Sequence, residues 1–106
     1  MATYEDFKKL EIKTARIIEA REHPSADRLY ILDIDIGGEK RQIVAGIRNY
    51  YSIEELAGKN IAVITNIEPA VIRGIESNGM LLAASNDQGL SILTLDKDIS
   101  SGSIIK

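Results

Sequence analysis

The arginines of this chain are its first candidates for chemistry. Of the six arginines, four flank predicted loops or strand ends: Arg28, Arg41, Arg48 and Arg73. A guanidinium group is planar and donates two parallel hydrogen bonds, which matches the oxygens of a phosphate. These four side chains predict a phosphate-binding surface; the alternative is that each is only a solubilising surface charge.

A second candidate region is the segment 66–80, a long polar connection between two apolar stretches. Long ordered loops in small proteins often carry function. Asn66 and Ser77 offer hydrogen bonds to a base edge or a ribose hydroxyl. Met80 offers an apolar contact to an unstacked base, or else belongs to the core. With the four arginines, these three side chains make up the predicted RNA-binding set.

Few residues of the chain are suited to catalysis or to binding a metal ion. His23 is the single histidine, and it lies beside Pro24 with Asp27 four residues on. We interpret it as a loop-structuring residue; a hydrolase built on His23 is the alternative. Because the chain has one His and no Cys, it offers neither a thiolate nor a two-imidazole metal site. Glycine-rich phosphate or dinucleotide motifs are missing too, so we expect a protein that is not an enzyme and uses no cofactor.

Composition sets the broad class. The 106 residues predict one domain, 1–106, and 13 basic against 16 acidic residues leave a net charge of -3. An acidic balance disfavours a nucleic-acid binder, although local clustering decides the field at a site. Apolar runs are too short to span a membrane, and Glu5 and Asp6 occupy the place of a signal peptide, so we expect a cytoplasmic protein.

The hydrophobic pattern predicts mostly short strands. Capping signals predict helices over 3–10 and from Ser52 to Gly58. Alternating apolar residues predict strands over 12–20, 29–36, 41–45, 60–65, 79–85 and 90–95, with a glycine turn at 37–40, an irregular segment at 66–78 and a polar tail from 96. This order predicts an all-β fold, a five-stranded Greek-key OB barrel with a helix between strands 3 and 4, with an open β-sandwich as the competitor.

Four motifs, in order, carry a family resemblance. They are the run from His23 to Tyr30, the segment 41–46, the Asn49-Tyr50-Tyr51 loop and the segment 73–84. With them the chain resembles the tRNA-binding domain found in methionyl-tRNA synthetases and phenylalanyl-tRNA synthetase β chains. Within that family it is most similar to stand-alone methionyl-tRNA synthetase C-terminal domains, or β subunits. It is more distantly similar to the CsaA chaperones.

The resemblance implies an OB barrel that forms a homodimer through its C-terminal region and binds tRNA by shape and backbone. Four Tyr and one Phe are too few for a stacking platform, which agrees with that mode. The implied partners are tRNA and methionyl-tRNA synthetase, which the module would assist in trans; a chaperone or protein-interaction module is the alternative. The family's Ser-x-Gly-Met motif falls intact on 77–80, and its Asn-Leu-Lys-Pro motif falls on 66–69 with Glu68 in place of the lysine.

Overall fold

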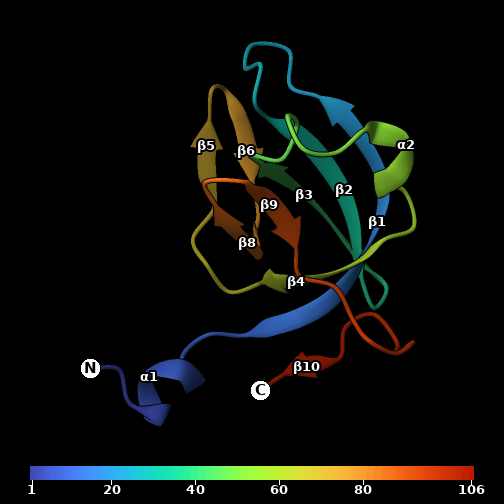
Figure 1. Ribbon diagram of the computed structural model, residues 1–106. Coiled ribbons are helices and arrows are strands. Elements are labelled where there is room, and N and C mark those ends of the chain that lie inside the picture. Colours follow the sequence, from blue (N-terminus) through green and yellow to red (C-terminus); the bar gives the residue numbers. More distant parts are fainter.

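One long strand organises the sheet. The computed structural model describes residues 1–106, in which β1 (Ile12–Glu22) pairs antiparallel with β2 (Tyr30–Ile36) on one side and with β4 (Asn60–Ile64) on the other. The sheet order is β3-β2-β1-β4-β7, with β3 (Glu39–Ala45) and β7 (Met80–Leu81) at its two ends. A bulge between Ile17 and Glu19 interrupts the β1–β2 register. Bulges bend strands, and the sheet curls into the half-barrel seen in Figure 1.

Strand alternation fills the barrel, as the sequence predicts. In β2, Leu32 and Ile34 are fully buried, whereas Asp33 and Asp35 on the other face are partly exposed. The largest fully buried side chains come from the strands β1 to β4, from the loop after β3 and from α2: Ile17, Leu32, Ile34, Ile43, Ile47, Leu56, Ile61 and Val63. The predicted OB-like, mostly β class is confirmed.

Both helices are short and capped as predicted. In α1 (Tyr4–Lys8), Thr3 is the N-cap and forms a capping box with Asp6. In α2 (Ile53–Leu56), Ser52 and Glu55 form the same box. The cap backbone N–H groups donate to these carboxylates and lower the pKa of Asp6 and of Glu55. Neither helix combines the length and the apolar character that a membrane span requires.

The segment 66–78 is more regular than predicted. It contains a hairpin of β5 (Ala70–Ile72) and β6 (Ile75–Ser77), turning at Arg73 and Gly74, whose φ angles are 51° and 87°. Two positive φ values make a tight turn that twists with its strands. Sequence patterns point to such turns through Asn-Gly or Asp-Gly, and Arg-Gly does not carry that signal.

The predicted strand 79–85 divides in two. The first part is β7; the second is β8 (Ala83–Asn86), which pairs with β9 (Gly89–Ile92) as a separate hairpin. Leu82 lies at the break, where its N–H donates to the Ala62 carbonyl and its own carbonyl accepts from Leu93. The chain therefore changes sheets at Leu82, which alternation of apolar residues alone does not reveal.

The tail is anchored to β1. The buried Thr14 hydroxyl donates to the Ser100 carbonyl at 2.9 Å, and Gly102 N–H donates to the Thr14 carbonyl at 2.7 Å. The last strand, β10 (Ile104–Ile105), then pairs with the start of β1. This places the chain end near α1 and away from the rest of the barrel (Figure 1).

Barrel closure depends on a close approach at Gly79. The buried Ser77 hydroxyl accepts a hydrogen bond from Val44 N–H at 2.9 Å and donates to the Gly79 carbonyl at 3.1 Å. Gly79 has a φ of 144°, and a Cβ there would lie 3.1 Å from Val63 Cγ1 and 3.3 Å from Ile43 Cγ2. Only glycine meets both the angle and the space.

We expect Gly79→Ala to lower the free energy of unfolding by about 2–3 kcal/mol, because it adds overpacking to a disallowed angle. Urea denaturation measures the loss. Gly38→Ala is the matched control, since Gly38 also has positive φ but has open space around its Cα. It should cost about 1 kcal/mol. Equal losses in the two variants would show that the contact with Ile43 and Val63 contributes nothing.

Candidate nucleic-acid interface

Three of the four predicted arginines belong to segments that meet at one end of the barrel. The loop 23–29 joins β1 to β2, and its backbone carbonyls are the meeting point. The Arg48 side chain donates through Nη1 to the Ala26 carbonyl at 3.2 Å. The backbone N–H of Arg48 donates to the Arg28 carbonyl at 3.4 Å. Arg73 Nη2 donates to the Ser25 carbonyl at 2.9 Å from the tip of the β5–β6 hairpin. We call Arg28, Arg48 and Arg73 the arginine cluster.

The cluster is only partly neutralised within the chain. Arg48 Nη2 lies 3.0 Å from Glu22 Oε2 and forms an ion pair. Arg28 and Arg73 are exposed, and neither has a carboxylate partner within 4.0 Å. The positive charges of Arg28 and Arg73 are therefore not neutralised by a carboxylate, and a phosphate that binds them has no carboxylate to displace, although Arg73 also donates to the Ser25 carbonyl.

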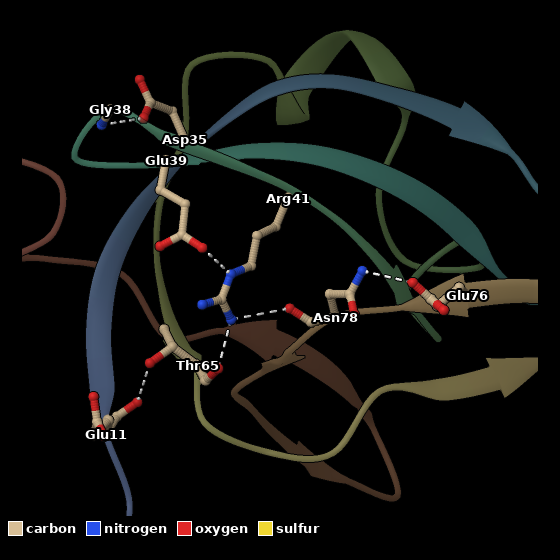
Figure 2. Close-up of polar contacts among 8 residues, drawn as sticks. All are labelled: Glu11, Asp35, Gly38, Glu39, Arg41, Thr65, Glu76 and Asn78. Atoms are coloured by element: carbon tan, nitrogen blue, oxygen red, sulfur yellow. Dashed lines mark hydrogen bonds and ion pairs between the residues drawn. The ribbon is translucent and has the colours of Figure 1, made fainter.

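Arg41 lies at the other end of β3, beside Ile34 in the register rather than beside the loop 23–29. Figure 2 shows its guanidinium held on three sides. Nε donates to Glu39 Oε2 at 2.8 Å, and Nη1 donates to the carbonyls of Thr65 and Asn78. Arg41 thus ties β3 to both ends of the segment 65–78. It lines a separate polar cleft of about 510 Å³.

The three expected groove residues differ in what they present. Asn66 uses both ends of its amide: Oδ1 accepts from Glu11 N–H at 2.8 Å, and Nδ2 donates to the Lys9 carbonyl at 2.7 Å. Ser77 is buried in the barrel closure. Ser77 therefore has no polar group free for a nucleotide, whereas the exposed Asn66 amide keeps its second N–H. Met80 is 45% exposed and has an accessible side chain.

The loop-structuring interpretation of His23 is confirmed. The ring is 3% exposed, its Nε2 lies 3.0 Å from the Ile72 carbonyl, and its Nδ1 accepts from Ser25 N–H at 3.1 Å. Both nitrogens are engaged, so the ring is not free to act as the general base of a hydrolase built on His23. No group of three or more His, Cys, Asp or Glu side chains is placed to hold a metal ion.

Two features of the site escape sequence reasoning. One is the backbone of Ser25 and Ala26, whose carbonyls orient Arg73 and Arg48; carbonyls leave no residue-type signal. The other is the Glu22–Arg48 ion pair, which joins the end of β1 to the loop after β3. Its residues are 26 positions apart in the chain, and only the barrel brings them together.

Sequence and structure comparisons relate this chain to known proteins. A family model described as a putative tRNA binding domain matches residues 12–104. A methionine–tRNA ligase of Caldanaerobacter subterraneus is 50% identical over 103 residues, which is 97% of this chain and 16% of that protein. One from Thermococcus kodakarensis is 44% identical over 104 residues, 98% of this chain and 14% of that protein. The chain thus spans about a seventh of the length of these curated relatives.

Solved structures share the whole fold. A methionyl-tRNA synthetase (MetRS) related protein from Pyrococcus horikoshii superposes with a TM-score of 0.93 at 28% identity, covering 100% of this chain and 98% of that one. A CsaA chaperone from Picrophilus torridus gives a TM-score of 0.93 at 31% identity, covering 100% of both chains. The family match and the near-complete relatives agree with the barrel and its motifs: this chain belongs to the tRNA-binding domain family.

Proposed function

We propose that this chain is a non-catalytic module, spanning 1–106, that binds tRNA through its sugar-phosphate backbone and overall shape. The observation that carries the proposal is the arginine cluster. The guanidinium groups of Arg48 and Arg73 donate to carbonyls of the loop that carries Arg28, in a barrel whose family is a tRNA-binding domain, and neither Arg28 nor Arg73 is paired with a carboxylate. Phosphate contacts of this kind supply affinity without reading sequence.

The tyrosines favour backbone recognition over base stacking. Tyr30 is buried, and its hydroxyl donates to the Tyr51 carbonyl at 2.7 Å. The Tyr51 hydroxyl accepts from Ile92 N–H at 2.9 Å. Of the three tyrosines in the barrel, only Tyr50 has an exposed ring, at 52%. One ring is not a platform on which successive bases stack.

The proposed setting is assistance of a methionyl-tRNA synthetase in trans, in the cytoplasm. The relatives that match are methionine–tRNA ligases, in which a segment like this chain is a small part. A module with a net charge of -3 is expected to bind tRNA modestly. Modest affinity suffices when the module and the enzyme are held together, because the second contact becomes intramolecular.

We also propose a homodimer through the chain ends. Helix α1 buries none of its residues, and with β10 it borders an apolar hollow of about 300 Å³. Phe7 and Ile104 line this hollow and are 38% and 72% exposed. Two copies that cover each other's hollow would remove this apolar surface from water and place two arginine clusters on one particle.

A CsaA-like chaperone is the second candidate. It is favoured by the superposition on CsaA structures and by the same exposed hollow, which would then receive an unfolded peptide. Prevention of client aggregation without any tRNA binding would favour it over the first proposal.

The arginine cluster predicts a salt-dependent interaction with tRNA. Arg28→Ala should weaken tRNA binding by roughly threefold to tenfold, to a similar extent for every tRNA, because one phosphate contact is lost. Titrations at about 50 and about 200 mM salt should show a slope smaller by about one. Lys97→Ala removes the same charge from the segment after β9, outside the arginine cluster, and is the matched control. An equal loss in both variants would remove the cluster from the site.

The chain-end hollow predicts the oligomeric state. Sedimentation equilibrium should give about twice the 11.7 kDa chain mass for the native protein. Phe7→Asp combined with Ile104→Asp should give the monomer, since two buried carboxylates would face apolar surface. Val71→Asp, at an equally exposed position on β5, should leave the dimer intact. A monomeric native protein would reject the homodimer.

A further inference from the structure

His23 is buried in an otherwise exposed stretch of loop. Its neighbours Pro24 and Ser25 are exposed, whereas the His23 ring is 3% exposed. The ring lies between the loop 23–29, which carries Arg28, and the β5–β6 turn, which carries Arg73. The proposed phosphate contacts do not involve this side chain, so its burial requires a separate explanation.

The partners of the ring determine its tautomer. Ser25 N–H is a backbone group and can only donate, so Nδ1 is the unprotonated acceptor. The Ile72 carbonyl can only accept, so Nε2 carries the proton and donates across 3.0 Å. The neutral ring therefore makes one bond to its own loop and one to the hairpin, and both nitrogens are satisfied.

Ser25 adds two further links between the same elements. Its hydroxyl donates to the Arg73 carbonyl at 3.3 Å, and its carbonyl accepts from Arg73 Nη2 at 2.9 Å. With the His23–Ile72 bond, three hydrogen bonds connect the loop to the turn. The name latch is used below for His23, Ser25, Ile72 and Arg73.

The hairpin needs an external attachment at its tip. β5 and β6 are three residues each and form a two-stranded sheet of their own, which is marginal in water. At its base, Ser77 is bonded to Val44 on β3. At its tip, Arg73 has a φ of 51°, which an arginine adopts only when its surroundings hold it there. The latch is the set of contacts that holds this tip.

We propose that His23 is a positioning residue for RNA binding: it fixes the β5–β6 turn to the loop 23–29 and so keeps Arg73 against the loop that carries Arg28 and contacts Arg48. The effect of His23 on RNA binding rests on the proposed function, whereas the latch itself is a property of the free protein. Arg28 is carried by the loop and does not depend on the hairpin. His23 therefore acts on binding through Arg73 and not through Arg28.

A double-mutant cycle on tRNA affinity tests this route. Arg73→Asn removes the charge with a residue that tolerates positive φ. His23→Asn keeps an acceptor for Ser25 N–H but cannot reach Ile72. We expect each single variant to weaken tRNA binding by roughly threefold to tenfold. The double variant should bind tRNA no more weakly than Arg73→Asn alone, because the two substitutions remove the same contact with RNA. His23→Asn combined with Arg28→Ala should instead show the product of the two losses.

His23→Gln is the rescue variant. Its amide nitrogen reaches close to the position of Nε2 and can donate to the Ile72 carbonyl, so it should bind tRNA more tightly than His23→Asn. Ser25→Ala removes one link and should couple to Arg73→Asn in the same sense, which keeps the test open if His23→Asn does not fold. Equal additivity with Arg73→Asn and with Arg28→Ala would overturn the proposal.

Amide hydrogen exchange separates the latch from the RNA function. In the free protein, His23→Asn should accelerate exchange in β5 and β6 and leave β4 unchanged, and His23→Gln should restore protection. Unchanged exchange in the hairpin would overturn the latch even if tRNA binds. If the native protein binds no tRNA while the hairpin loses protection as expected, the proposed function fails and the latch stands.

Discussion

The structure depends on the close approach of the Gly79 backbone to Ile43 and Val63. At Gly79, the backbone that leads into β7 lies against both β3, which is at one end of the sheet, and β4, which is an inner strand. The buried Ser77 hydroxyl bonds this chain to β3 two residues earlier. A larger residue at 79 would force the two strands apart, and the barrel would lose the closure on which its core packing depends.

The same closure creates the candidate interface. Because residues 77–79 are fixed against β3, the segment before them has to leave and return within a dozen residues, and it does so as the β5–β6 hairpin. Its tip reaches the loop between β1 and β2, far from Arg73 in sequence. The candidate site therefore lies in connections between strands, and the strands bring these two connections together.

Charge pairing allows an acidic chain to present the candidate cationic site. On the barrel, Arg21 pairs with Asp33 and Arg41 with Glu39, so these guanidinium groups add little to the outer field. The two free charges of the arginine cluster, Arg28 and Arg73, lie at one end. The net charge of a protein determines its electrostatic field only at long range. Close to the surface, the field that a phosphate meets depends on which cationic side chains have no carboxylate partner. Methionine–tRNA ligases and CsaA chaperones share this fold, so the site and not the fold has to distinguish their roles.

The sequence by itself determined the fold class, because alternation in β2, the Gly37-Gly38 turn and the two capping boxes are local signals that agree with one another. It also identified the arginines, whose chemistry depends on residue type. The tertiary structure alone decided how each is used. Arg41 and Arg48 cannot be told from Arg28 in the sequence, yet in the fold they form ion pairs with Glu39 and Glu22. Asn66 and Ser77 form hydrogen bonds with the backbone. The hairpin at Arg73 and the change of sheet at Leu82 were hidden for the same reason: long-range contacts, which no local pattern encodes, determine which groups remain free.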